Sequence, residues 1–124
     1  MRRHRAPGAG NARELAVMKV LVEEGWLCAS RRHIGGAGDI LAVRAWAWTP
    51  NGPATRHCLD AMLIEVKSTA RSPWVNFGQA DRQAMVETAE QYGCEAWLYY
   101  WPPRGQLVRI PANEWPPLRR KDAA

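Results

Sequence analysis

The sequence predicts an α/β fold in which a small mixed β-sheet is flanked by helices. Apolar residues change between helical spacing and strand spacing along the chain, in the order α-β-β-β-α-β-β. The third strand, the second helix and the fourth strand form a βαβ unit, and such units pair their strands in parallel. The length of 124 residues fits one domain. We therefore expect a single domain over residues 1–124, with flexible basic tails at about 1–10 and 116–124.

The first helix is predicted at residues 12–24. Asn11 is a plausible N-cap, apolar residues recur on one face, and Gly25 is placed to end the helix. A short apolar strand is expected next, at 26–29. A loop with three glycines follows and ends at Asp39, which opens the second strand.

Two long strands, at 39–48 and 56–67, are expected to pair as an antiparallel hairpin. The sequence Thr-Pro-Asn-Gly-Pro at 49–53 is a strong turn signal between them. After a loop, the second helix is predicted at 79–92, with Gly93 as its stop.

The last two strands are predicted at 95–101 and 106–110. Apolar side chains occupy both faces of the first of these strands, which is typical of an inner strand covered on both sides. The second is expected at an edge of the sheet. The sequence after residue 111 is rich in proline and charge, so it is expected to be a tail.

The chain is basic, with a formal net charge of +5 and a sequence pI near 9.6. This balance favours a polyanionic partner such as nucleic acid. Basic residues cluster at the two ends of the sequence: Arg2, Arg3, Arg5, Arg119, Arg120 and Lys121. Such clusters are either solvated tails or arms that contact a nucleic-acid backbone.

The three cysteines argue against a disulfide framework and against a zinc site. Cys28, Cys58 and Cys94 are odd in number and widely separated, so we expect buried free thiols in a reducing compartment. No apolar segment follows the basic N-terminus as in a signal peptide, and no apolar run approaches the length of a membrane span. The sequence therefore predicts an intracellular, soluble protein.

Charged residues are predicted to gather where the two long strands meet. The start of one hairpin strand lies beside the end of its partner, so Asp39 and Glu65 are expected side by side. Glu65 and Lys67 are two residues apart and point to one face, while Val66 points into the core. Two neighbouring carboxylates repel unless a cation lies between them, and Mg²⁺ prefers such oxygen ligands.

Each candidate site residue, Glu14 included, also has a purely structural interpretation. Glu14 is predicted in the first turn of the first helix, where the helix dipole favours an acidic residue in any case. Asp39 follows glycines and could be a turn residue, and a Glu-x-Lys tripeptide such as 65–67 is common on exposed strands. The joint pattern is stronger than any of its parts.

That pattern resembles the PD-(D/E)XK nuclease superfamily and, within it, the archaeal-type Holliday junction resolvases. It consists of Gly10 and Glu14 at the helix start, Gly-Gly-Ala-Gly-Asp ending at Asp39, and Ile-Glu-Val-Lys-Ser-Thr at 64–69. The resemblance runs from about residue 10 to 101 and implies a restriction-endonuclease-like core. It also implies an Mg²⁺- or Mn²⁺-dependent endonuclease that acts as a homodimer on four-way DNA junctions in recombination and repair.

The resemblance assigns roles to individual residues. Glu14, Asp39 and Glu65 match the family's acidic site residues, with Asp39 and Glu65 as metal ligands and Glu14 binding directly or through water. Lys67 matches the catalytic lysine, and the Val66 carbonyl would be a further metal ligand.

Further residues are assigned around this site. The DNA-contact set comprises the tail arginines Arg2, Arg3 and Arg5 together with Arg31, Arg32, His33, Ser68 and Arg71; a solvated loop is the alternative for those after Arg5. Gln79 and Gln83, with Asp81 between them, would form hydrogen bonds to the residues of the site or cap the second helix. The candidates for a dimer interface are Trp74, Phe77, Trp97, Tyr99 and Trp101, although the core of one chain is slightly favoured for most of them.

The segment from Asp39 to Glu65 is longer than usual for this family and carries Trp46 and Trp48, so we interpret its extended tip as an element that probes DNA. Three alternatives remain at this point. The chain could be a restriction-like or repair nuclease that cuts linear or flapped DNA, or a non-catalytic basic DNA-binding domain. A nuclease that acts on RNA is also conceivable, although the chain has no recognisable RNA-binding signature.

Overall fold

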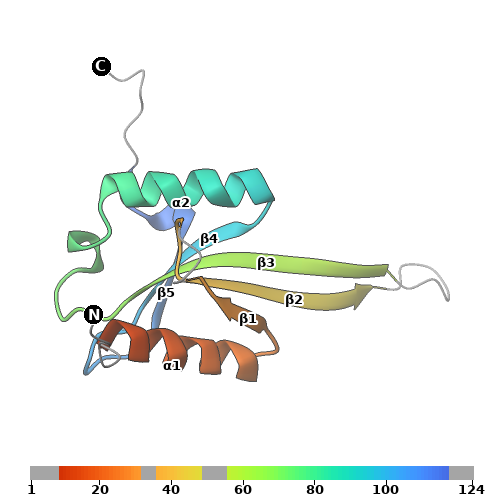
Figure 1. The fold of residues 1–124 in the computed structure, drawn as a ribbon, viewed down its shortest axis with the longest axis horizontal. Helices are drawn as coiled ribbons and strands as arrows, with labels where there is room; N and C mark the ends of the chain where they lie inside the picture. Colours follow the sequence, from red (N-terminus) through yellow and green to blue (C-terminus); the bar gives the residue numbers. More distant parts are fainter. Residues whose placement is uncertain (1–8, 32–35, 49–55, 118–124) are drawn as a thin grey trace, which may run out of the picture.

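The computed structural model describes residues 9–31, 36–48 and 56–117. A five-stranded sheet forms the middle layer, with one α-helix on each side (Figure 1). The elements in chain order are α1 (Ala9–Glu23), β1 (Leu27–Ser30), β2 (Ile40–Trp48), β3 (Arg56–Lys67), η1 (Pro73–Val75), α2 (Gln79–Tyr92), β4 (Glu95–Tyr100), β5 (Val108–Pro111) and η2 (Ala112–Glu114). The predicted mixed α/β architecture and the order of its elements are confirmed.

The strands lie in the sheet in the same order as in the sequence, β1-β2-β3-β4-β5. The β3–β4 pair is parallel, as the βαβ unit predicted, and the other three pairs are antiparallel. In the hairpin, Ile40 pairs with Ile64, which places the residue before β2 beside the end of β3. This register positions the candidate site.

Alternation along β3 divides the core into two clusters. Ile64 and Val66 point toward α1, where they pack with Val17 and Leu21. Leu63 points toward α2 and packs in the cluster that contains Phe77, Met85 and Leu98. Each helix therefore buries its apolar face on one side of the sheet. None of the helices in the described part of the chain is long and apolar enough to cross a membrane.

Several boundaries differ from those predicted. Helix α1 begins at Ala9 rather than at 12, so Asn11 lies inside the helix and is not its N-cap. Gly93 ends α2 as predicted, in the left-handed conformation with φ of 68°. The first strand is Leu27–Ser30, the fourth ends at Tyr100, and the fifth is Val108–Pro111. The predicted turn at 49–53 lies outside the described residues, as do 1–8 and 118–124 of the predicted tails.

The segment after β5 contributes to the core, which the sequence interpretation did not anticipate. The chain forms η2 and then buries Trp115, which is only 7% exposed. The Trp115 indole donates a hydrogen bond to the Ile110 carbonyl (2.9 Å), and its ring packs edge-on against Phe77 with centroids 5.0 Å apart. The described start of the predicted C-terminal tail is therefore anchored at its first turn.

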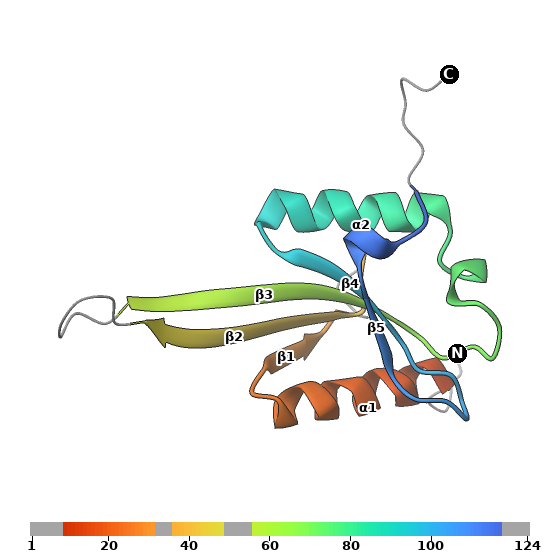
Figure 2. The same cartoon turned by 180° about the vertical axis from the view of Figure 1, so that it is seen from behind.

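The hairpin of β2 and β3 extends well beyond the rest of the sheet (Figure 2). Strand β1 pairs with β2 only as far as Val43, and β4 pairs with β3 only from Met62 onward. The hairpin continues past these residues as a ribbon of two strands.

Candidate active site

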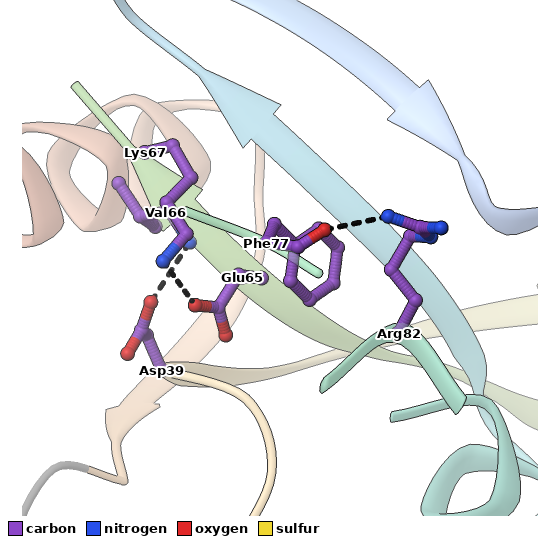
Figure 3. A network of polar contacts seen from close by, with 6 residues as sticks. All are labelled: Asp39, Glu65, Val66, Lys67, Phe77 and Arg82. Carbon is purple, nitrogen blue, oxygen red and sulfur yellow. Dashed lines mark hydrogen bonds and ion pairs between the residues drawn. The ribbon is translucent and has the colours of Figure 1, made fainter. Parts of the chain in front are cut away.

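Asp39 is held at the base of the hairpin by hydrogen bonds on both sides. Its backbone N–H donates to the Ile64 carbonyl (2.8 Å), and its carbonyl accepts from the N–H of Arg31 (2.8 Å). Its carboxylate Oδ2 accepts a hydrogen bond from the N–H of Val66 at 2.8 Å (Figure 3). The side chain is therefore fixed against the end of β3.

Glu65 and Lys67 lie on the face of β3 that α2 covers, as the two-residue spacing predicted. The Lys67 ammonium forms an ion pair with Glu65 Oε2 at 3.1 Å, and the two side chains are 21% and 16% exposed. Lys67 Nζ also lies 5.9 Å from the centre of the Phe77 ring. Figure 3 shows Asp39, Glu65 and Lys67 directed toward one another.

A pocket of about 440 Å³ opens beside these residues, between the base of the hairpin and α2. Asp39 and Glu65 line it together with residues 36–38, which precede Asp39. The opposite wall comes from Phe77 and from three residues of α2: Asp81, Ala84 and Met85. The carboxylates thus face a concave space that a ligand can enter.

The carboxylate of Glu65 is electrostatically perturbed. Burial and the neighbouring Asp39 charge raise the pKa of Glu65 to about 7, and Asp81 adds a smaller effect in the same direction. Lys67 opposes the shift through its charge and its hydrogen bond. One neighbouring ammonium is therefore too little positive charge to keep Glu65 fully ionised at neutral pH, and a bound cation would favour the ionised form.

Glu14 approaches this end of the molecule from the other layer. It lies three residues before Val17 on the sheet-facing side of α1 and is 9% exposed. The preceding residue, Arg13, donates to the Pro102 carbonyl (3.1 Å) and stacks over Trp101, so the start of α1 is fixed near the end of β3 and β4. Because α1 begins at Ala9, Glu14 is not in the first turn, and the helix-dipole explanation for it is wrong. Its membership of the site stays a prediction.

Two side chains at the pocket supply the kind of oxygen ligand that a hard divalent cation prefers. Among the described residues, no three His, Cys, Asp or Glu side chains are gathered closely enough to hold a metal ion. Asp39 and Glu65 nevertheless present oxygen donors in one pocket, and Mg²⁺ commonly binds through one or two carboxylates while keeping several waters. The residues present therefore fit Mg²⁺ or Mn²⁺ with Asp39 and Glu65 as side-chain ligands.

The described members of the predicted DNA-contact set are Arg31, Ser68 and Arg71, and none of them lines the pocket. Arg31 directly follows β1 and is half-buried, Ser68 directly follows Lys67, and Arg71 is exposed. The Arg71 carbonyl accepts a hydrogen bond from the Tyr100 hydroxyl at 2.7 Å, which fixes the loop after β3. The remaining members, Arg2, Arg3, Arg5, Arg32 and His33, lie outside the described residues.

Of the three α2 residues predicted to support the site, one lines the pocket. Gln83 donates to Glu87 at 2.8 Å, within the helix, and does not line the pocket; neither does Gln79. Asp81 lines it instead, because positions 81, 84 and 85 share the helix face that meets the sheet. Helical spacing would have separated these positions from 79 and 83, had the orientation of α2 been known.

Two of the five aromatic residues considered for a dimer interface belong to the core of the chain itself. Phe77 is 0% exposed and Tyr99 is 2% exposed, so a second copy has no access to them. Trp74, Trp97 and Trp101 are half-buried, and their place in an interface stays a prediction. The cysteines Cys28, Cys58 and Cys94 are free thiols, but they are half-buried rather than buried as predicted.

Arg82 has a structural role that the sequence did not reveal. It is 8% exposed, and its guanidinium donates to the Phe77 carbonyl at 2.7 Å and lies 5.7 Å from the centre of the Trp74 ring (Figure 3). This contact ties the loop that carries Phe77, and hence one wall of the pocket, to α2. Nothing in the sequence distinguishes Arg82 from the exposed arginines.

A scan against protein-family models gave no match, and a search among curated protein sequences gave none. Comparison with solved structures shows similarity to Hjc of Archaeoglobus fulgidus, a Holliday junction resolvase from an archaeal hyperthermophile, solved at 1.6 Å resolution. The two chains are 20% identical, with a TM-score of 0.57 over 86% of this chain and 75% of that chain. This similarity establishes the fold, so the predicted restriction-endonuclease-like core is confirmed.

Proposed function

We propose that this chain is a structure-selective endonuclease that resolves four-way DNA junctions by metal-dependent hydrolysis of phosphodiester bonds. The observation that carries the proposal is the pocket at the base of the hairpin, which Asp39 and Glu65 line together while Lys67 forms an ion pair with Glu65. The shared fold with a Holliday junction resolvase supports the choice of substrate. The net charge of +5 fits a polyanion such as DNA.

Asp39 and Glu65 would hold the cation, Mg²⁺ or Mn²⁺, with the Val66 carbonyl as a further ligand and Glu14 binding directly or through water. When bound, a divalent cation supplies positive charge that polarises the scissile phosphate and lowers the pKa of an attacking water. The Val66 N–H that donates to Asp39 fixes the orientation of one ligand in advance. Preorganisation of this kind reduces the reorganisation needed during the reaction.

Lys67 would contact the reacting phosphate. Its ammonium has three donors, so it can keep its contact with Glu65 while another N–H reaches a phosphate oxygen or the attacking water. The positive charge would stabilise the negative charge that develops on the phosphate in the transition state. The half-buried position of Lys67 against Phe77 limits its rotamers, which favours a constant geometry.

The proposed enzyme acts inside the cell as a homodimer, because a four-way junction needs two opposed strands to be cut. Arg31, Ser68 and Arg71 would contact DNA phosphates around the pocket, as would the basic residues outside the described part of the chain. Exposed Arg71, in the loop after Lys67, is suitably placed for a bidentate phosphate contact.

The test compares cutting of a labelled four-way junction by the wild type, Asp39→Asn and the control Glu90→Gln. Glu90 is an exposed carboxylate in the last turn of α2 and lies outside the pocket. We expect Asp39→Asn to reduce the cutting rate by about 10³-fold or more, since it removes a metal ligand, while junction binding in EDTA is retained. Glu90→Gln should cut at the wild-type rate.

Two outcomes would replace the proposal. Equal cutting of matched linear or flapped DNA by the wild type would assign the chain to restriction-like or repair nucleases with the same chemistry. Absence of cutting with either Mg²⁺ or Mn²⁺, together with tight DNA binding, would make it a non-catalytic DNA-binding domain. Undiminished cutting by Asp39→Asn would show that the site is placed wrongly. Undiminished cutting by the wild type in EDTA would rule out the metal-dependent mechanism.

A further inference from the structure

The part of the hairpin that projects beyond the sheet has two unpaired edges. Beyond the last pairs with β1 and β4, the hairpin continues for five residue pairs, from Arg44 with Asp60 to Trp48 with Arg56. We call residues 44–48 and 56–60 the arm. Figures 1 and 2 show that neither helix covers it.

The two faces of the arm differ in chemistry. Leu59 is four residues before Leu63 on the same strand and therefore lies on the α2 side, where its partner is Ala45. Arg44 and Trp46 lie on the α1 side, opposite Asp60 and Cys58. Among the described side chains, the α2 side thus presents small and aliphatic groups, whereas the α1 side presents an indole, a guanidinium, a thiol and a carboxylate.

A second pocket lies at the root of the arm, on its α1 side. It has a volume of about 320 Å³, and its aromatic walls are Trp26 and Trp97. Arg44 also lines it, with the guanidinium carbon 4.3 Å from the centre of the Trp26 ring. Two carboxylates also line it: Asp60, and Glu95, which accepts a hydrogen bond from the Trp97 indole at 3.0 Å.

These groups continue along the arm as one surface. Trp46 is 45% exposed and is two residues beyond Arg44 on the same face of β2. We call this set, Trp46 with the pocket lined by Trp26, Arg44, Asp60, Glu95 and Trp97, the arm surface. It combines flat aromatic groups with a guanidinium held by stacking.

This chemistry suits unpaired nucleotides better than a paired duplex. Exposed bases stack on indole rings, and a guanidinium adds both stacking and a contact to the backbone phosphate. The carboxylates of Asp60 and Glu95 can accept hydrogen bonds from the exocyclic amino groups of bases.

We propose that the arm surface binds unpaired nucleotides of the branched DNA, at a site separate from the pocket where the strand is cut. This inference rests on the proposed function, since it assumes a branched DNA substrate. Asp60 and Glu65 are five residues apart on β3, about 17 Å along the strand, and point to opposite faces. The arm surface therefore contacts a part of the substrate that the cutting pocket does not reach.

The test compares Trp46→Ala with Leu59→Ala, which removes a more exposed apolar side chain from the other face of the arm. Leu59 is 71% exposed, so both variants should keep the wild-type circular dichroism spectrum. Binding is titrated in EDTA with fluorescein-labelled single-stranded oligodeoxycytidine and oligothymidine, and with a four-way junction that carries unpaired cytidines at its centre. We expect Trp46→Ala to weaken binding of the cytidine probes roughly 5- to 100-fold, and Leu59→Ala less than twofold.

Oligothymidine, which has no exocyclic amino group, should bind more weakly than oligodeoxycytidine to the wild type. Equal weakening by both variants, or by neither, would overturn the inference. A shift from dimer to monomer on sedimentation of Trp46→Ala would show that the surface contacts a second copy instead. Cutting of the fully paired junction by the wild type, measured in parallel with Mg²⁺, reports on the proposed function alone, so the two failures are distinguishable.

Discussion

The two ends of the β2–β3 hairpin have the same strands and one continuous register but opposite environments. At the base, Ile40 and Ile64 pair with each other and are 0% exposed. Helix α1 covers one face of the sheet there, and α2 covers the other. On the arm, Trp46 and Leu59 are 45% and 71% exposed. Charged groups are half-buried at the base, and apolar groups are exposed on the arm.

This difference indicates how one element serves two purposes. Neighbouring strands and both helix layers fix the base, so Asp39 and Glu65 can be held close together despite their repulsion. The arm has only two strands, and a two-stranded ribbon alone is marginally stable in water. Its exposed Trp46 continues the surface that Trp26 and Trp97 line at the root of the arm, and a contiguous patch of this kind is better explained by contact with a partner than by a contribution to stability.

The largest expected effect on stability comes from replacing a leucine with alanine at each end of the hairpin. Leu63 and Leu59 lie on one face of β3, four residues apart, but Leu63 is 2% exposed and packs in the α2-side core. We expect Leu63→Ala to lower the free energy of unfolding by about 2–5 kcal/mol, because it leaves a cavity in the core. Leu59→Ala should change it by less than about 0.5 kcal/mol. Urea denaturation of both variants measures the difference.

Similar losses in the two leucine variants would contradict this contrast. They would mean that the α2-side face of the arm is packed in solution, against another chain or against a segment outside the described residues. Repeating the denaturation at several protein concentrations separates these cases, since only packing between chains makes the loss depend on concentration.

The second prediction concerns how stability depends on pH through Glu65, at the base of the hairpin. The pKa of Glu65 is raised to about 7 from 4.5, so the folded chain binds a proton more tightly than the unfolded chain. Protonated Glu65 therefore adds to the free energy of unfolding, and this addition is fully present below pH 4.5 and is lost as the pH rises through 7. Without metal, the loss of unfolding free energy caused by the raised pKa of Glu65 should reach roughly 3 kcal/mol. Glu65→Gln should remove this pH dependence.

Urea unfolding in EDTA at pH 4.5, 6 and 8 tests this dependence on the wild type and Glu65→Gln. The difference between the two proteins isolates Glu65 from other groups that titrate in this range. Added Mg²⁺ should restore stability to the wild type at pH 8 more than at pH 4.5, because the ionised pair binds the cation. An unchanged pH dependence in Glu65→Gln would show that Glu65 ionises normally in the folded chain.

The features that the sequence predicted well are those set by local spacing. Alternation and the turn signal located the hairpin strands, and the predicted bounds 56–67 and 79–92 agree with β3 and α2. The pairing of Asp39 with the end of β3 followed from hairpin geometry alone. Two-residue spacing likewise placed Glu65 and Lys67 on one face.

The features that the sequence did not predict depend on how distant elements pack. Whether Asp81 or Gln83 meets the pocket depends on the rotation of α2 about its axis, which only its contacts with the sheet determine. Burial of Trp115 requires Phe77 as a partner from 38 residues earlier in the chain. The early start of α1 at Ala9 precedes the residue that looked like a cap, because a capping side chain permits a helix start without requiring one.

The smallest predicted effect tests how tightly the backbone is held just before Asp39. Gly36 and Gly38 both have positive φ, 85° and 87°, so alanine strains either position by about 1 kcal/mol or slightly more. At Gly38 a Cβ would lie 2.6 Å from Leu63 Cδ1 in the core, whereas at Gly36 it would meet only the end of the Arg31 side chain at 3.1 Å. We expect Gly38→Ala to lose about 1 kcal/mol more unfolding free energy than Gly36→Ala. This difference is at the low end for overpacking, because the branched end of Leu63 can turn aside.

Gly38→Ala should also slow junction cutting more than Gly36→Ala, since any shift of Gly38 moves the adjoining Asp39. Equal stability and equal cutting rates in the two variants would show that the backbone before Asp39 adjusts freely, and that the Val66 hydrogen bond alone positions the carboxylate.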